Sequence, residues 1–216
     1  MMTLFVYLFV YLSDGLMAFV SRFSRSRSSS RSPSRSEAER LSPAVSVSEL
    51  ERLLCTGKTA CNHADEVWPR LYIGDQDIAS DRRALARLGV THVLNCAQSR
   101  WRGGGAHYAG MNITYHGIEA HDSPNFDMSV NFYPAADFIH KALTSGGKVL
   151  VHCTVGVSRS ATLVLAYLMI RQNLTLVEAI RKVKDHRGVT PNRGFLRQLN
   201  GLDSILRESR KSPPSS

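Results

Sequence analysis

Residues 149–162 read VLVHCTVGVSRSAT, an apolar run followed by a polar turn and the start of a second apolar run. The first run, residues 148–152, predicts a buried strand, and residues 160–172 predict a helix. A strand that passes through a turn into a helix is typical of α/β proteins. Such a turn directs its backbone N–H groups and the positive end of the helix dipole toward one point, where an anion can bind.

The side chains of this turn suit phosphate chemistry. Arg159 offers a planar fork that holds two phosphate oxygens, and Gly156 gives the backbone the freedom that a tight turn needs. Cys153 stands near the helix N-terminus and a cation, a position that lowers the pKa of a thiol and yields the nucleophilic thiolate at neutral pH. The alternative, a small core residue at Cys153, leaves the offsets of His152, Gly156 and Arg159 unexplained.

The rest of the chain alternates between strands and helices. Short apolar runs predict further buried strands at residues 67–73, 92–96 and 113–118. Helical spacing is found at residues 46–55, 81–88, 128–144, 160–172, 175–186 and 192–206, the first of them opening with a capping box of Ser46 and Glu49. This order predicts an α/β fold with a largely parallel central sheet flanked by helices. Ligands bind at the carboxyl ends of such strands, where the turn after residue 152 lies.

The pattern His-Cys-x-x-Gly-x-x-Arg-Ser of residues 152–160 resembles the signature loop of the cysteine-dependent protein tyrosine phosphatases. The helix that follows resembles that of the dual-specificity branch. Further matches, at residues 67–74, 91–95 and 191–199, extend the resemblance over residues 45–205. Because no rhodanese-like kinase-docking domain precedes the motif in this sequence, the resemblance is to the small atypical members.

The resemblance implies a phosphatase site and a role for each residue of it. Cys153 would be the nucleophile, and the phosphate would be held by Thr154, Val155, Gly156, Val157, Ser158 and Arg159. Ser160 would donate a hydrogen bond to the sulfur and help to expel the thiolate, although its hydroxyl is equally suited to cap the helix. His152 would orient the cysteine. Asn192 and Phe195 would support the loop, with core packing an equal alternative for Phe195. The resemblance implies no cofactor.

Displacement of an alkoxide or phenolate at neutral pH also needs a proton donor. Asp122 is the best candidate, because it follows the apolar run 113–118 in a proline-containing loop and matches the general-acid position of the family. The alternative is that Asp122 caps a turn through its Ser-Pro neighbours. Glu119 and Asp127 are weaker candidates and resemble ordinary surface charges.

The resemblance implies hydrolysis of phosphotyrosine and phosphoserine or phosphothreonine on proteins through a phosphocysteine intermediate, with mitogen-activated protein kinases as family-level candidate substrates. Two other functions stay open. A phosphoprotein-binding adaptor would use the same pocket without turnover. Such an adaptor would be identified by the absence of the nucleophile, the arginine or the acid. An enzyme acting on RNA 5′-phosphates or inositol lipids would favour lysines in the loop, whereas Thr154, Val155 and Val157 are uncharged.

Composition sets outer limits on these functions. The 216 residues, 43% hydrophobic and 21% charged, fit one globular domain, which we expect at residues 41–206, with a disordered tail at 207–216. The four cysteines form no close pair, which indicates neither a disulfide framework nor a zinc knuckle and favours a reducing compartment. The histidines show no metal-binding spacing, so we expect no metal. We assign no role to the loop at residues 101–105.

The N-terminal residues differ in composition from the rest. Residues 1–20 are apolar but broken at residues 13–15, too short an unbroken run for a membrane span. Three alternatives stay open for this segment. It has no function and is bypassed by a start at Met17, it is a weak membrane anchor, or it is a secretion signal. Residues 21–40 carry six arginines among many serines, which accounts for much of the net charge of +9 and predicts disorder. This arm is a phosphorylatable linker or a nuclear-localisation or nucleic-acid patch. We expect phosphoprotein partners in the cytoplasm and nucleus, with a membrane-associated fraction left open and nucleic acid disfavoured.

Overall fold

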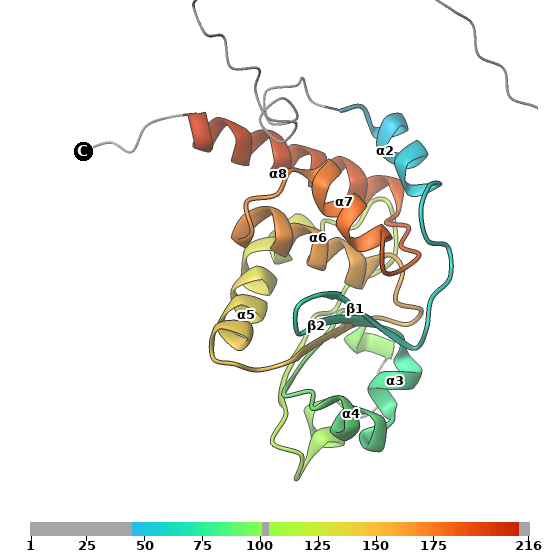
Figure 1. The fold of residues 1–216 in the computed structure, drawn as a ribbon, viewed down its shortest axis with the longest axis vertical. Helices are drawn as coiled ribbons and strands as arrows, with labels where there is room; N and C mark the ends of the chain where they lie inside the picture. Colours follow the sequence, from blue (N-terminus) through green and yellow to red (C-terminus); the bar gives the residue numbers. More distant parts are fainter. Residues whose placement is uncertain (1–44, 101–103, 212–216) are drawn as a thin grey trace, which may run out of the picture. The chain divides into compact units, whose positions relative to one another are not determined.

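A computed structural model describes residues 45–100 and 104–211 of the chain (Figure 1). Its centre is a five-stranded sheet in the order β1-β2-β5-β3-β4. The strands are β1 (Ala64–Trp68), β2 (Leu71–Gly74), β3 (His92–Asn95), β4 (Thr114–Gly117) and β5 (Val149–His152). β1 pairs with β2 in antiparallel orientation, and the other neighbours are parallel. The predicted α/β fold with a largely parallel sheet is therefore confirmed.

Helices cover both faces of this sheet (Figure 1). The helices are α2 (Val47–Leu54), α3 (Gln76–Ser80), α4 (Arg82–Leu88), α5 (Phe132–Thr144), α6 (Arg159–Arg171), α7 (Leu176–Lys184) and α8 (Arg193–Lys211). Short 3-10 turns are η1 (Gln98–Arg100), η2 (Gly104–Tyr108) and η3 (Ser129–Asn131). The larger apolar cluster joins one face to α2, α5, α6, α7 and α8, and the smaller one joins the other face to α3, α4 and η2.

The strand and helix on either side of the turn are the most deeply buried elements. All four residues of β5 are buried: Val149 and Val151 belong to the larger cluster and Leu150 to the smaller one. A parallel strand covered on both faces reads as such a continuous apolar run. In α6 every residue from Arg159 to Met169 is buried. This burial fixes the turn between β5 and α6 from both ends.

Three local expectations need correction. Residues 67–73 form two strands of a hairpin instead of one, because Pro69 offers no N–H and Arg70 has a φ of +64°, which turns the chain between β1 and β2. Helix α3 is additional, and the Asp75 carboxylate caps it. Helix α8 runs to Lys211, so residues 207–211 of the expected tail are helical. An ion pair of Arg207 with Asp203 supports this end of the helix.

Several expectations concern residues that the structure does not describe. The apolar segment 1–20, the Arg/Ser-rich arm 21–40 and the domain boundary near residue 41 all lie outside the described residues. The unassigned loop 101–105 is described only from Gly104, where η2 begins. Within residues 45–100 and 104–211, no helix is both long and apolar enough to cross a membrane.

Candidate active site

The loop from Cys153 to Ser158, here called the signature loop, connects the carboxyl end of β5 to α6. The rest of the fold binds four consecutive carbonyls of this loop. The bonds are Gln76 N–H to Thr154 O at 3.1 Å, Arg187 Nη2 to Val155 O at 3.4 Å, Arg187 Nε to Gly156 O at 2.8 Å and Thr190 N–H to Val157 O at 2.8 Å. The carbonyls of the loop therefore point away from its centre and toward the surrounding protein.

Four N–H groups of the same loop have no acceptor among the described residues. In the described part of the chain, the amides of Thr154, Val155, Val157 and Ser158 make no hydrogen bond, whereas the Gly156 amide donates to the Cys153 sulfur at 3.2 Å. Backbone donors that converge without acceptors form an anion-binding nest. Because this nest stands at the N-terminus of α6, the helix dipole adds to its attraction for a phosphate.

Gly156 is required at its position for two reasons. Its φ is +78°, a left-handed conformation that other residues rarely adopt. A Cβ atom here would also overlap the carbonyl of Gly74 and the guanidinium of Arg187. The loop therefore keeps this shape only with glycine at residue 156.

The Cys153 thiol lies at the base of the nest and is only 2% exposed. Burial by itself raises the pKa of this thiol, but hydrogen bonds from the Ser160 side chain, from the Ser160 and Gly156 backbone, and the charge of Arg159 outweigh it and lower the pKa. The Ser160 hydroxyl lies 3.3 Å from Sγ. It is not the helix cap, since Ser158 occupies the N-cap position of α6. Buried Cys96, by contrast, has a raised pKa because of burial and the nearby Cys153 charge.

Arg159 is buried yet keeps a donor available. Its Nη1 donates to Ala120 O at 3.2 Å and its Nη2 to Thr154 Oγ1 at 2.9 Å, which holds the guanidinium across the loop. Its Nε is buried, makes no hydrogen bond within the described residues and lies 3.7 Å from a carboxylate oxygen of Asp122. A buried guanidinium with an unused N–H beside a nest of unused amides is suited to bind a phosphate dianion.

Asp122 lies at the rim of the signature loop. One oxygen of its carboxylate accepts hydrogen bonds from Ser158 Oγ at 2.7 Å and Asn192 Nδ2 at 2.9 Å. These bonds tie Asp122 to the loop and to the start of α8, so its side chain does not serve as a cap for its own turn. Asp127, one of the two weaker candidates, accepts hydrogen bonds from the amide and the hydroxyl of Ser129 at the start of η3.

The supporting residues lie around this centre. His152 is buried, which lowers its pKa to about 4, and its Nδ1 lies 3.3 Å from the Cys153 carbonyl oxygen. Asn192 also caps α8, because its Oδ1 accepts the Phe195 amide at 3.0 Å. The Phe195 side chain is fully buried in the larger apolar cluster, which is its core-packing role. Glu119 is exposed and makes no hydrogen bond to the described signature loop.

Sequence reasoning missed Arg187 and Asp65. Arg187 is fully buried and binds two signature-loop carbonyls, Asn62 O at 2.6 Å and the Asp65 carboxylate at 2.7 Å. Burial raises the pKa of Asp65, but hydrogen bonds from Asn62 and Arg187 outweigh it and lower the pKa. The pair joins residues 122 positions apart, and neither residue belongs to the loop motif, so no local pattern pointed to it.

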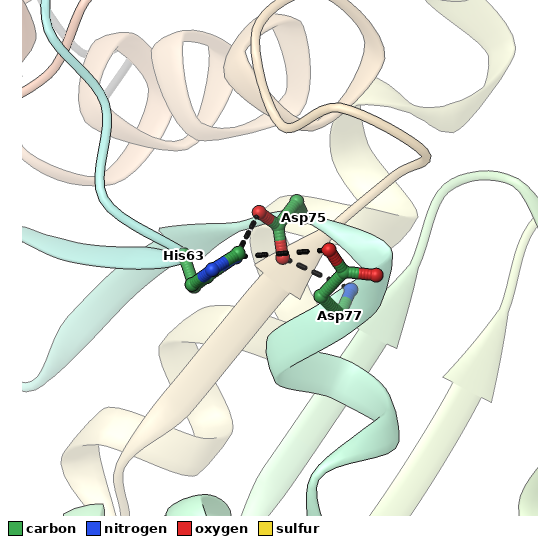
Figure 2. Close-up of side chains that lie close together, drawn as sticks. All are labelled: His63, Asp75 and Asp77. Atoms are coloured by element: carbon green, nitrogen blue, oxygen red, sulfur yellow. Dashed lines mark hydrogen bonds and ion pairs between the residues drawn. The ribbon is translucent and has the colours of Figure 1, made fainter.

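Three side chains beyond β2 have the spacing of metal ligands: His63, Asp75 and Asp77, whose ligand atoms lie within 4.8 Å of one another (Figure 2). Asp75 already uses both of its oxygens. One accepts the amides of Asp77 and Ile78 at 3.0 Å, and the other lies 2.7 Å from His63 Nδ1. The hydrogen bond to Asp75 raises the pKa of His63. The closeness of these three side chains is therefore explained by the capping of α3 by Asp75, which His63 pairs with.

Comparisons with known proteins agree with this geometry. A family model described as dual specificity phosphatase, catalytic domain, matches residues 71–204. Dual specificity protein phosphatase 26 from Homo sapiens is 66% identical to this chain over 197 residues, which are 89% of this chain and 93% of that protein, and the Mus musculus protein is 64% identical over the same length. Over most of its length the chain is therefore similar to the neuroendocrine-associated member of the family, as the residues at 56–65 also indicate.

Solved structures give the same result. Human DUSP28 is 29% identical over 72% of this chain and 99% of that chain, with a TM-score of 0.61. A mouse putative dual specificity phosphatase complexed with zinc tungstate is 30% identical over 74% of this chain and 98% of that chain, with a TM-score of 0.63. With the family model covering more than half of the chain, the protein belongs to the dual specificity phosphatase family, and it is a protein phosphatase.

Proposed function

We propose that this phosphatase hydrolyses phosphotyrosine and phosphoserine or phosphothreonine on proteins through a phosphocysteine intermediate. The observation that carries the proposal is the Cys153 sulfur with its lowered pKa, at the base of a loop in which four amides have no acceptor among the described residues. Thiolate, oxyanion donors and a carboxylate within one site are the groups that phosphoryl transfer through cysteine requires.

In the first step the Cys153 thiolate attacks phosphorus in line with the leaving oxygen, so that an S–P bond forms and the P–O bond breaks. Arg159 and the loop amides hold the three non-bridging oxygens, and Asp122 gives its proton to the leaving oxygen. Asp122 faces Arg159 at 3.7 Å before substrate binds.

In the second step Asp122 takes a proton from water, which attacks the phosphorus of the phosphocysteine. The S–P bond breaks, and phosphate and thiolate are released. The Ser160 hydroxyl, 3.3 Å from the sulfur, is placed to donate to the thiolate as it leaves. The same network that lowers the pKa of Cys153 for attack therefore also favours its departure.

The surroundings of the loop support a protein substrate over a polyanion. Val155 is 62% exposed and Val157 is half-buried, so the mouth of the loop presents apolar side chains where RNA or an inositol lipid would favour lysines. An adaptor without turnover is disfavoured because nucleophile, arginine and acid are all present and placed together. Mitogen-activated protein kinases remain the family-level candidate substrates.

Substrate class is tested by assaying phosphotyrosine, phosphoserine and phosphothreonine peptides against inositol lipids and 5′-phosphorylated RNA at two salt concentrations. The control for contaminating phosphatases is the Cys153→Ser protein. We expect turnover of all three peptide types by the wild type and none by Cys153→Ser. Turnover confined to lipid or RNA, or binding of peptides without turnover, would contradict the proposal.

A further inference from the structure

Residues 118–128, here called the acid loop because they contain Asp122, connect β4 to η3 with neither helix nor strand. One end of this loop is bound by the active site, since the Ala120 carbonyl accepts a hydrogen bond from Arg159 Nη1 at 3.2 Å. The Asp122 side chain is 38% exposed. A catalytic group that is displaced by about 1 Å can lose about a hundredfold in rate. An exposed acid in an irregular loop therefore needs further support.

The far end of the acid loop is bound by Gln198, a half-buried residue of α8. Its Nε2 donates to the Phe126 carbonyl at 2.8 Å, and its Oε1 accepts the Met128 amide at 2.8 Å. A carboxamide carries both a donor and an acceptor, so one side chain pairs with both backbone groups. A glutamate at this position would lose the donor, and a lysine would lose the acceptor. The residue type thus matches the two groups that it binds.

The bond to Phe126 reaches Asp122 through a short turn. Directly after Asp122, the Phe126 amide donates to the Ser123 carbonyl at 3.0 Å, which closes a β-turn over residues 123–126. The Phe126 side chain packs against the larger apolar cluster. Because the last residue of the turn is fixed by Gln198 and by the core, the turn fixes the backbone next to Asp122.

Gly194, one helical turn before Gln198, lets α8 approach this turn closely. An added Cβ at Gly194 would overlap the Pro124 carbonyl group, which belongs to the same turn. Residues four apart lie on one face of a helix, so Gly194 and Gln198 both face the acid loop. Two independent features of α8, an absent side chain and a carboxamide, therefore fit the backbone of the loop that carries the acid.

We propose that Gln198 is a positioning residue for the general acid: it fixes the acid loop, in the space that Gly194 leaves, so that the Asp122 carboxyl stands at the leaving oxygen. The proposal rests on the proposed function, in which Asp122 protonates that oxygen. Gln198 touches no reacting atom and acts through the loop backbone, whereas Asn192 binds the carboxylate itself. Loss of Gln198 should therefore matter most where the leaving group needs a proton.

The test compares two small aryl phosphates of similar size, 4-nitrophenyl phosphate and phenyl phosphate. Nitrophenolate leaves with little protonation, whereas unsubstituted phenolate, whose conjugate acid has a pKa of ~10 like the tyrosine side chain, needs the proton. For each protein we take the ratio of kcat/KM on 4-nitrophenyl phosphate to kcat/KM on phenyl phosphate. The ratio is read within one protein, so a general loss of folded enzyme cancels.

Gln198→Met keeps an unbranched side chain and removes both hydrogen bonds, and we expect it to raise the ratio about tenfold. Gly194→Ala should raise the ratio as well, although alanine favours a helix more than glycine does, and it serves as the second variant if the first does not fold. The matched control is Asn200→Leu, which removes an amide of α8 that binds the Val45 carbonyl at 3.0 Å instead of the acid loop. Its ratio should equal that of the wild type.

A double variant separates positioning from a general role in the fold. Asp122→Asn alone gives the ratio of a site without its acid and should raise it further than Gln198→Met does. Adding Gln198→Met to Asp122→Asn should change the ratio by less than about twofold, because a residue that acts through Asp122 then has no acid to position. A role in the fold alone would not depend on Asp122.

Three results would overturn the positioning role of Gln198. They are an unchanged ratio in Gln198→Met, an equal rise in Asn200→Leu, and a rise that persists when Gln198→Met is added to Asp122→Asn. Failure of the proposed function gives a different result. In that case Asp122→Asn itself would keep the wild-type ratio, or the wild type would cleave neither phosphate.

Discussion

Two opposing effects act on the reactive groups of this site, burial and hydrogen bonding. Burial works against the Cys153 thiolate, and the hydrogen bonds of Ser160 and Gly156 together with the charge of Arg159 reverse the effect. For His152 burial prevails over the hydrogen bond to the Cys153 backbone and the charge of Asp75, and it lowers the pKa to about 4. Two adjacent residues at the end of β5 therefore differ in charge: the Cys153 thiol ionises more easily than a free thiol, and the His152 imidazole stays neutral.

The role of Asp122 predicts a specific change in pH dependence. The wild type should show a bell-shaped kcat/KM, because Cys153 must be ionised and Asp122 protonated. Asp122→Asn should remove the alkaline limb and slow phosphoserine and phosphothreonine peptides more than an activated aryl phosphate, because alkoxides need a proton to leave. Steady-state rates across pH measure both effects. A complete bell with equal slowing of both substrate types would place the acid at another residue.

The buried His152 predicts a dependence of stability on pH. Its pKa is about 4 in the folded state and near 6.5 when unfolded, so the unfolded chain binds the extra proton as the pH falls below 6.5. The stabilisation is complete above pH 6.5 and is lost as the pH falls toward 4. Between pH 7 and pH 5 the wild type should lose about 2 kcal/mol more unfolding free energy than His152→Gln.

Urea unfolding of the two proteins at both pH values makes this measurement. His63 has a raised pKa and therefore acts in the opposite direction, stabilising the fold below pH 6.5 and losing this effect as the pH rises. Because His63 is present in both proteins, its contribution cancels in the difference. Equal losses in wild type and variant would mean that His152 is not held neutral by its burial.

At the scale of elements, the signature loop is held from outside by its carbonyls, and Arg187 supplies two of the four bonds. Arg187→Lys should keep a positive charge near Asp65 but cannot reproduce the planar fork that spans several acceptors. We expect kcat/KM to fall about tenfold or more, because one or two loop bonds are lost. The pKa of the Cys153 thiol, measured by alkylation across pH, should rise as the loop amides lose their alignment.

Asp65→Asn is the companion variant. It keeps the shape of the side chain and leaves the Arg187 charge buried without its counterion, which should cost about 3 kcal/mol of unfolding free energy. Asp65→Asn thus reports the contribution of the pair to the stability of the fold, and Arg187→Lys reports its contribution to the alignment of the signature-loop amides. If Arg187→Lys left both kcat/KM and the thiol pKa unchanged, the bonds to the Val155 and Gly156 carbonyls would have no part in shaping the loop.

The same elements show why some features could be read from the sequence and others could not. The strand β5, the signature loop and α6 are contiguous, and their burial and spacing are local, so residues 148–172 were predicted almost to the residue. Residues 67–73 were predicted as one strand because the residues on both sides of Pro69 and Arg70 are apolar, and the left-handed backbone of Arg70 appears only in the structure. The Arg187–Asp65 pair depends on the complete fold, because the two residues are far apart in sequence.

At the scale of the whole chain, every group assigned to the reaction lies between residues 122 and 192, well inside the described part of the structure. We therefore predict that removal of residues 1–40 changes kcat on a small aryl phosphate by less than about twofold, since no catalytic group is lost. Its effect should appear in cellular location, which fluorescence microscopy of tagged proteins would follow. A collapse of activity on the small substrate would instead mean that the catalytic domain begins before residue 41.

The central claim is that Cys153 carries the phosphoryl group during turnover. Rapid acid quenching of the enzyme with a phosphotyrosine peptide, followed by mass spectrometry of the fragment that contains Cys153, tests it directly. We predict a phosphoryl group on Cys153 in the wild type, absent from the Cys153→Ser protein, which should also show no turnover. Turnover by Cys153→Ser near the wild-type rate, or a phosphoryl group found on another residue, would contradict the account.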